Sequence, residues 1–157
     1  FDPGARSTYT ERELGNYYNW YAATAGTGLS SMAYDQQAPG SICPRGWKLI
    51  NNPGKNRATD FTDLLYIYGI LQSPTSSIIV DGKAPLMLEM PINLVLAGDY
   101  LKSWGAYHMG RYSDLWASRA VDANYSAMFR YDSFVNNTFP WYENSKASGH
   151  SIRCVAE

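Results

Sequence analysis

The chain has 157 residues, the usual length of one globular domain and enough to bury a hydrophobic core without a metal ion. Charged residues make up 17% of it, and 13 basic residues nearly balance 14 acidic ones, so the net charge of −1 provides no long-range field for nucleic acid or an anionic membrane. No stretch approaches the ~20 apolar residues of a membrane span, so we expect no nucleic-acid partner and no membrane insertion by this domain.

The N-terminal part of the chain combines a polar start with an aromatic segment. Residues 1–13 are polar without periodicity, and we interpret them as a tail or linker before a single domain at 14–157. Because the start also lacks the apolar region of a signal peptide, we expect a mature or trimmed chain. Residues 15–21 are rich in Tyr and predict a strand, whereas the Ala, Gly, Ser and Thr of 22–40 predict a long loop.

The clearest element is a helix, which follows a short predicted strand at 46–50 and a turn at Pro53-Gly54. Its apolar residues recur with the i, i+3, i+4, i+7 spacing of one helical face. Thr59 or Asp60 can cap the N-terminus, and Asp63 in the first turn suits the helix dipole. The residues of the apolar face are Phe61, Leu64, Leu65, Tyr68 and Leu71.

The middle of the chain is punctuated by Ser, Pro and Gly. Residues 73–84 predict a loop that can hold a short strand at 78–80. Residues 94–98 predict a strand that ends at a glycine, and residues 105–113 predict another loop.

The C-terminal third predicts three antiparallel strands. They lie at 115–118, 125–131 and 151–155, with polar turns at 121–123 and 136–149 between them. One clear helix, several short antiparallel strands and long loops together indicate an α+β fold.

The middle one of these strands, 125–131, has one face more apolar than the other. Side chains alternate between the two faces of a strand. Because the odd-numbered residues are the more apolar, we predict that Ser126 and Arg130 face outward.

A recognition surface is the main functional hypothesis from composition. The chain is 15% aromatic, and residues 107–150 are denser still in Trp, Tyr and Phe, interleaved with Asn, Asp and Arg. Rigid aromatic side chains among short polar ones are typical of antibody recognition surfaces. The alternative is that half of these aromatics point inward, as strand alternation requires. The candidate ligand-binding residues are Tyr107, Tyr112, Asp114, Trp116, Ser118, Arg119, Asn124, Arg130, Asp132, Asn136, Asn137, Trp141, Tyr142 and Asn144.

Cys43 and Cys154 are the only cysteines. Neither belongs to a C-x-x-C pair or lies near a histidine cluster that would indicate a metal site, so we expect no metal. A disulfide and two free thiols both remain open from the residues alone. A disulfide would close a loop of about 110 residues, stabilise the fold by roughly 4–5 kcal/mol on the chain-entropy model, and indicate an oxidising compartment.

Several sequence blocks follow one another in a fixed order. They are GNYYNWYAA at 15–23, SICPRGWKL at 41–49, Asp60-Phe61 at the helix start, Gly98, Trp116-Ala117-Ser118, and GHSIRCV at 149–155. Together they resemble the Fibrobacter succinogenes major paralogous domain family. The resemblance covers roughly residues 14–157, and the C-P-x-G-W-x-L and terminal G-x-S-[IV]-R-C-V blocks are specific as a pair. Two departures stand out: the family's W-S-S-T stretch reads Trp116-Ala117-Ser118-Arg119, and its leucine-proline after G-W-x reads Leu49-Ile50.

The resemblance implies a C-type-lectin-like fold and an exported bacterial protein, extracellular or at the cell surface. It also implies that Cys43 and Cys154 pair. Related lectin-fold proteins are the variable proteins of diversity-generating retroelements, in which the segment before the last strand carries diversified, ligand-facing residues. The function implied is an adhesin-like domain that binds an unknown protein or glycan on another cell or surface. The alternative is the structural head domain of a pilin or surface-coat subunit, with residues 107–150 packed against neighbouring subunits.

Enzymatic and calcium-dependent functions lack their motifs. The Glu-Pro-Asn, Gln-Pro-Asp and Trp-Asn-Asp stretches of sugar-binding C-type lectins are absent, and Asp60 and Asp63 are better explained as helix-start charges. The only histidines are His108 and His150, and no G-x-S-x-G, phosphate loop or H-E-x-x-H is present. We therefore expect a protein that is not an enzyme and needs no cofactor.

Overall fold

The computed structural model of the protein describes residues 16–28, 36–52, 57–90 and 92–157. The predicted tail at 1–13 and the predicted turn at Pro53-Gly54 lie outside the described residues. Among the residues described, no helix combines the length and apolar character needed to cross a membrane.

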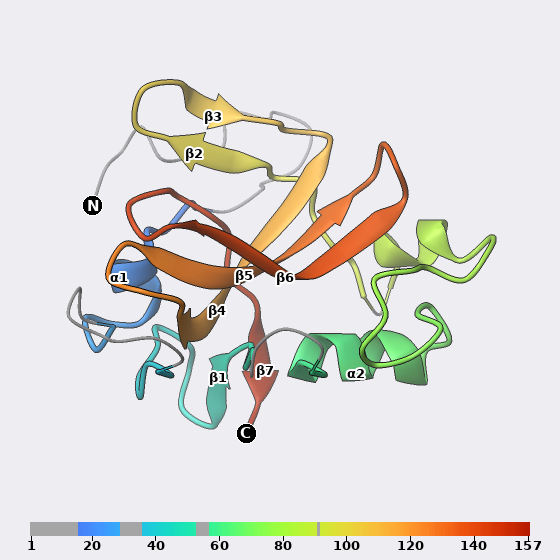
Figure 1. Cartoon of the computed structure of the whole chain (residues 1–157), viewed down its shortest axis with the longest axis horizontal. Coiled ribbons are helices and arrows are strands. Elements are labelled where there is room, and N and C mark those ends of the chain that lie inside the picture. Colours follow the sequence, from blue (N-terminus) through green and yellow to red (C-terminus); the bar gives the residue numbers. More distant parts are fainter. Residues whose placement is uncertain (1–15, 29–35, 53–56, 91) are drawn as a thin grey trace.

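An antiparallel three-stranded sheet crosses the middle of the domain (Figure 1). Its strands are β4 (Tyr112–Ala120), β5 (Tyr125–Asp132) and β6 (Asn137–Ser145), in the order β4-β5-β6. The register shifts once along each pairing, between Trp116 and Ala120 on β4 and between Met128 and Arg130 on β5. Each shift changes the cross-strand partners of the residues that follow it.

Two smaller antiparallel pairs flank this sheet. The hairpin of β2 (Asp99–Leu101) and β3 (Gly105–Tyr107) lies at the top of Figure 1. The pair of β1 (Trp47–Leu49) and β7 (Cys154–Ala156) lies at the bottom. The domain is therefore a mixed α+β structure of short antiparallel strands.

The larger hydrophobic core lies between the sheet and helix α2 (Asp60–Ile67). Phe61 of α2 and Phe129 of β5 meet edge to face, with ring centroids 4.8 Å apart. A 3-10 helix, η2 (Ala84–Met87), contributes the buried Met87 to the same core. The helix was predicted with its N-cap, but it ends at Ile67, before the last apolar positions of the predicted face.

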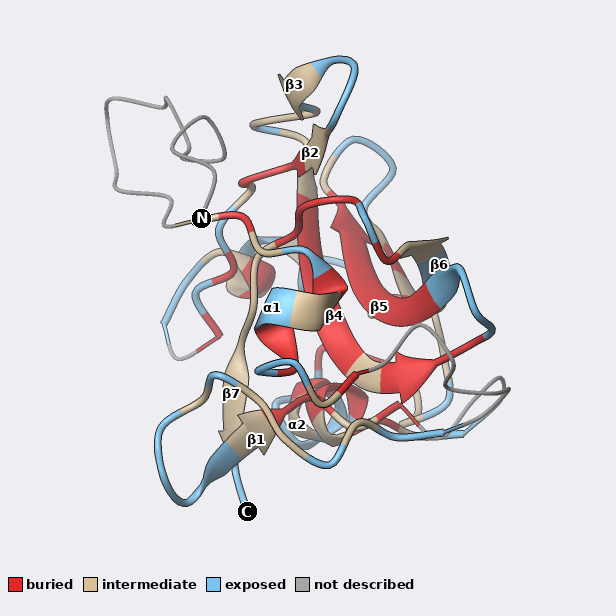
Figure 2. Cartoon of the chain, turned by 90° about the vertical axis from the view of Figure 1, so that its left-hand side faces the viewer, coloured by how far each residue is buried: buried red, intermediate tan, exposed pale blue. Residues whose placement is uncertain are grey.

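A smaller core covers the opposite face of the sheet. There, Trp20 of the short helix α1 (Trp20–Ala23) packs with Trp116 of β4 and Met128 of β5. Figure 2 shows α1 in front of the buried β4. The predicted strand at 15–21 is wrong from Trp20 onward, because the side chain of Asn19 accepts the Ala22 N–H and caps a helix that begins at Trp20; before it, Tyr18 makes an isolated antiparallel bridge to His150.

Burial of both faces of the sheet corrects the predicted facing of β5. Ser126 and Arg130 were predicted to point outward, yet they are 0% and 8% exposed. The prediction assumed that only one face of the strand packs against protein. Tyr125 at the strand start is instead the exposed residue, at 46%.

The predicted strand arrangement is wrong in three further places. Residues 136–149 were predicted as a polar turn, but most of them form β6, whereas β7 pairs with β1. Residues 94–98 form no strand, and the predicted loop at 105–113 contains β3 and the start of β4. The polar composition of residues 136–149 was misleading because β6 is a sheet-edge strand, whose exposed residues can be polar.

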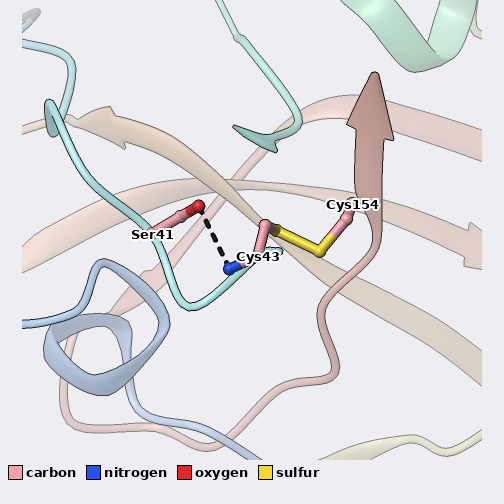
Figure 3. The surroundings of a disulfide bond; sticks show 3 residues. All are labelled: Ser41, Cys43 and Cys154. Atoms are coloured by element: carbon pink, nitrogen blue, oxygen red, sulfur yellow. Dashed lines mark hydrogen bonds between the residues drawn. A yellow bond between two sulfur atoms is a disulfide. The ribbon is translucent and has the colours of Figure 1, made fainter. Parts of the chain in front are cut away.

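A disulfide joins Cys43 and Cys154, with a Cα–Cα distance of 5.7 Å (Figure 3). This confirms the pairing that the family resemblance implied. Cys154 is the first residue of β7 and pairs in register with Leu49 of β1. The side chain of Ser41 accepts a hydrogen bond from the Cys43 N–H at 3.3 Å. The bond therefore ties the C-terminal strand to the segment that leads into β1.

The N-cap of α2 gives a direct stability prediction. The side chain of the buried Thr59 accepts the Thr62 N–H, while the Thr62 side chain accepts the Thr59 N–H. Thr59→Ala is expected to lower the free energy of unfolding by about 1 kcal/mol, because it leaves a helix N–H without its acceptor. Thr59→Ser, which keeps the acceptor, should retain most of that stability in urea unfolding. Equal losses in the two variants would contradict the capping role.

Candidate recognition site

A buried ion pair lies at the centre of the candidate site. Asp114 of β4 and Arg130 of β5 are paired across the strands. Arg130 donates to both carboxylate oxygens, from Nε to Oδ1 at 2.7 Å and from Nη2 to Oδ2 at 2.6 Å. The Asp114 side chain is 0% exposed and that of Arg130 10%. Such a two-point, charge-assisted contact fixes the position of the guanidinium.

Two tyrosines hold the same guanidinium by cation–π contacts. Cζ of Arg130 lies 4.2 Å from the ring centroid of Tyr112 on β4 and 4.3 Å from that of Tyr142 on β6. Because the arginine belongs to the central strand, its contacts link all three strands of the sheet. The attraction is strongest where water is excluded, as it is here.

Ring contacts continue from Tyr112 in two directions. One series runs from Tyr112 to His108, Tyr107 and Trp104, with successive centroid distances of 4.5, 3.8 and 5.8 Å. The other runs through Arg111, whose Cζ lies 4.7 Å from the ring of Tyr112 and 5.4 Å from that of Phe134. We call the connected set the aromatic stripe: Trp104, Tyr107, His108, Arg111, Tyr112, Arg130, Phe134 and Tyr142.

The stripe has a buried centre at Arg130 and is open to solvent toward its ends. Trp104 is 71% exposed and Phe134 is 81% exposed, at the turns of the β2–β3 and β5–β6 hairpins. Tyr107 and Tyr142 are 42% and 40% exposed. Large apolar side chains grouped at the surface in this way indicate an interaction site more often than scattered ones do.

Two further polar pairs anchor the stripe. Arg111 donates to Asp132 from Nε at 3.2 Å and from Nη2 at 2.9 Å, and the Phe134 N–H donates to the same carboxylate. Although partial burial favours its protonated form, the hydrogen bonds from Arg111 and Phe134 hold the pKa of Asp132 below the ordinary value. Nδ1 of His108 lies 3.1 Å from Oδ1 of Asp99.

His150 lies beneath the buried ion pair. Its ring is 0% exposed, meets Trp116 edge to face at 4.4 Å, and places Nδ1 3.6 Å from Oδ2 of Asp114. Neither ring nitrogen has a hydrogen-bond partner among the described residues. Burial, together with the positive charge of Arg130, lowers the pKa of His150 to about 3, so the ring is neutral at pH 7 and the contact with Asp114 is not an ion pair.

Burial acts on the Asp114 carboxyl in the opposite sense. It raises the pKa to about 6, against the opposing effect of the hydrogen bonds and charge of Arg130. At pH 7 the cluster therefore contains a carboxylate, a guanidinium and a neutral imidazole.

A close backbone crossing positions His150. The residue pairs with Tyr18, and the preceding Gly149 pairs with Tyr100 of β2. A Cβ on Gly149 would lie 2.9 Å from Cβ of Tyr100 and 3.0 Å from Cβ of Tyr17. A side chain at 149 would therefore push these segments apart and move the imidazole.

The structure divides the fourteen predicted ligand-binding residues into three groups. The first group forms the stripe or holds it in place, and its members Asp114, Arg130 and Asp132 are buried. A second group borders a hollow of about 340 Å³ beside β6. The members of the first group are Tyr107, Tyr112, Asp114, Arg130, Asp132 and Tyr142; those of the second are Arg119, Trp141 and, again, Tyr142.

The third group contributes no member of the stripe. Trp116 is a core residue at 0% exposure, and its indole donates to the Tyr18 carbonyl at 2.7 Å. It is therefore not available to a ligand at the surface. The Ser118 hydroxyl donates to the side-chain oxygen of Gln37 at 2.6 Å. The predicted asparagines lie at both ends of the β5–β6 hairpin, with Asn136 and Asn137 at its turn, and Asn124 and Asn144 at its other end.

Sequence reasoning missed several residues of the site. Trp104 precedes the segment considered, although a Trp in the polar turn Lys102-Ser103-Trp104-Gly105 has little to pack against and could have indicated an exposed ring. Arg111, Phe134 and His150 lie within that segment but enter the site through contacts between strands. Among the described residues, no group of three His, Cys, Asp or Glu side chains could hold a metal ion.

Comparison of the chain with protein-family models, with curated proteins and with solved structures gave no match.

Proposed function

We propose that this protein is an extracellular, adhesin-like ligand-binding domain with a C-type-lectin-like fold, and that the aromatic stripe is its recognition surface. The observation that carries the proposal is the exposed stripe fixed in place by the buried Asp114–Arg130 pair. The sequence resemblance supports the same fold and places ligand-facing residues in the segment before the last strand.

The chemistry of the stripe suits recognition of another macromolecule. Binding hot spots are enriched in Trp, Tyr and Arg, because these side chains combine large apolar contact with a polar group. Trp104 and Tyr107 expose such rings, and Arg111 exposes 43% of its side chain. The partner proposed is a protein or glycan on another cell or surface.

Rigidity favours affinity at such a surface. Cation–π contacts and two-point ion pairs hold Tyr112, Tyr142 and Phe134 before any ligand arrives. Side chains that are already ordered lose less conformational entropy on binding. The disulfide supports the extracellular location, since such bonds persist in oxidising compartments.

The test compares two triple variants, each of which replaces three exposed apolar side chains by alanine. Trp104→Ala/Tyr107→Ala/Phe134→Ala removes exposed stripe residues without touching the buried pair. Ile67→Ala/Ile78→Ala/Met90→Ala removes three exposed apolar residues elsewhere, at 77%, 54% and 77% exposure. Fluorescently labelled protein is applied to intact bacterial cells of several species and to an array of cell-surface oligosaccharides. The stripe variant is expected to bind at least about tenfold more weakly than wild type, because losing hot-spot contacts costs more than 1 kcal/mol.

The control variant should bind like wild type, and both variants should keep nearly the wild-type melting temperature. No wild-type binding to any cell or glycan, or equal binding by the two triple variants, would contradict the assignment. Association of the purified wild type through the stripe, detected by sedimentation and lost in the stripe variant, would instead favour an assembly subunit.

A further inference from the structure

The cluster beneath the stripe contains a carboxylate with two alternative partners. Arg130 occupies both oxygens of Asp114 from one side. His150, neutral and without a hydrogen-bond partner among the described residues, lies on the other side with Nδ1 3.6 Å from Oδ2. When the imidazole carries its proton on Nε2, Nδ1 is an acceptor, and a carboxylate, which can only accept hydrogen bonds, cannot satisfy it.

Protonation of Asp114 changes which of the two partners its carboxyl group can satisfy. A carboxylic acid has one O–H to donate, and Nδ1 of a neutral imidazole protonated at Nε2 accepts it. Arg130 has only donor groups and loses its charged acceptor in the same step. A small movement of the carboxyl group toward His150 would then satisfy a ring nitrogen that has no partner in the part of the chain that the structure describes.

We propose that Asp114, Arg130 and His150 form a proton switch under the recognition surface, in which protonation of Asp114 transfers its hydrogen bond from Arg130 to His150 and releases the guanidinium from Tyr112 and Tyr142. The consequence for ligand binding rests on the proposed function. The switch itself is a property of the domain and can be measured without ligand.

Every charged or titratable group around Asp114 bears on the switch. From the other strands, Asp99 and Asp132 add negative charge that favours protonation of Asp114, while Arg130 opposes it. Tyr112 and Tyr142 contact the guanidinium, Arg111 is committed to Asp132, and His108 to Asp99. Burial, the largest influence, raises the pKa of Asp114 to about 6, which places the switch in the mildly acidic range.

Release of the guanidinium acts on the two tyrosines that contact it. The Arg130 guanidinium contacts both Tyr112 and Tyr142. Without the carboxylate, a guanidinium that is 8% exposed has an uncompensated charge and is drawn toward water or toward the remaining carboxylates. Tyr142 then loses its cation–π contact with Arg130, and Tyr112 keeps only its cation–π contact with Arg111.

The experiment is an NMR titration of the isotope-labelled protein from pH 7.5 to pH 5, with no ligand present. The signals followed are the Asp114 side-chain carboxyl carbon, the Arg130 Nε–H and the imidazoles of His108 and His150. The Arg130 and Asp114 signals are expected to move together with one midpoint near pH 6, while His150 stays neutral. An Arg130 signal that does not move while Asp114 titrates would overturn the proposal, as would an Asp114 carboxyl that stays charged to pH 5.

Three variants sharpen the titration. Asp114→Asn imitates the protonated carboxyl, so Arg130 should show its acid-limit signal at pH 7.5 and cease to titrate. Asp63→Asn, the same change at an exposed position of α2, should leave the Arg130 titration as in wild type. His150→Leu removes the acceptor of the protonated form and should lower the Asp114 midpoint; an unchanged midpoint would exclude transfer to His150. If Asp114→Asn does not fold, the wild-type titration and His150→Leu still decide the proposal.

This test is independent of the cell-binding test. A coupled titration together with no cell or glycan binding would support the switch and contradict the proposed function. Binding by the stripe with no Arg130 titration would support the proposed function and contradict the switch.

Discussion

Replacing Cys43 and Cys154 together by serine is expected to lower the free energy of unfolding by about 5 kcal/mol. The disulfide closes a segment with a sequence separation of 111 residues, and on the chain-entropy model a loop of that length restricts the unfolded chain strongly. The strands next to it, β1 and β7, are only three residues each, so their pairing alone holds the C-terminus weakly. Because domains of this size have total stabilities of about 5–15 kcal/mol, the loss should be visible directly as a lower urea midpoint.

The same loss should follow when wild type is reduced, which separates the covalent bond from the effect of serine. Intact mass after alkylation, with and without reductant, gives the thiol count in each sample. Two alkylated thiols in the native, unreduced protein would contradict the bond. A loss below about 1 kcal/mol in the double serine variant would show that strain or residual unfolded-state structure offsets the loop constraint.

The helix could be predicted from the sequence because its determinants are local. The spacing of Phe61 and Leu65, the capping threonine at 59 and the glycine after the last turn all lie within one stretch. The disulfide followed from the family resemblance, since the residues alone left two free thiols open.

The sheet was harder to predict because its facing is set by distant segments. Both faces of β5 are buried, one by Phe61 of α2 and the other by Trp20 of α1, so the rule of one apolar and one polar face failed at Arg130. The edge strand β6 has polar residues that are exposed, such as Glu143, or half-buried, such as Asn144, and they gave its composition the character of a turn.

The residue types of the candidate site could be predicted from the sequence, but the contacts among these residues could not. Tyr107, Tyr112 and Tyr142 stand out as aromatic residues in a polar segment. The pairing of Asp114 with Arg130 depends instead on the register between β4 and β5, which the sequence does not display locally. The same holds for His150, whose burial comes from pairing with Tyr18, far away in the chain.

Asp114→Ala is expected to lower the free energy of unfolding by about 3 kcal/mol at pH 7.5. The change leaves the Arg130 guanidinium buried without its acceptor, and removing one partner of a buried ion pair is far more destabilising than removing both. The carboxylates of Asp99 and Asp132 are close enough to influence Arg130 and Asp114, which favours the lower end of the usual range for such losses. Urea unfolding measures the loss, and Asp114→Leu combined with Arg130→Met is the control, expected to recover most of it. Equal losses in the single and double variants would mean that lost packing, not uncompensated charge, causes the effect.

The pH dependence of the same variant tests the protonation of Asp114. Its pKa is raised from 3.8 to about 6 in the folded state, so the stability contributed by the protonated carboxyl is present in full below pH 3.8 and is lost as the pH rises through about 6. His150 acts oppositely: its lowered pKa contributes stability above pH 6.5 that is lost as the pH falls through about 3. In wild type these two slopes nearly cancel between pH 4 and pH 6, whereas Asp114→Ala retains only the slope of His150. The stability difference between wild type and variant should therefore widen by about 1 kcal/mol for each pH unit below 6. A difference that stays constant from pH 7.5 to pH 4.5 would mean that Asp114 remains charged throughout, and the proton switch would then have no proton to respond to.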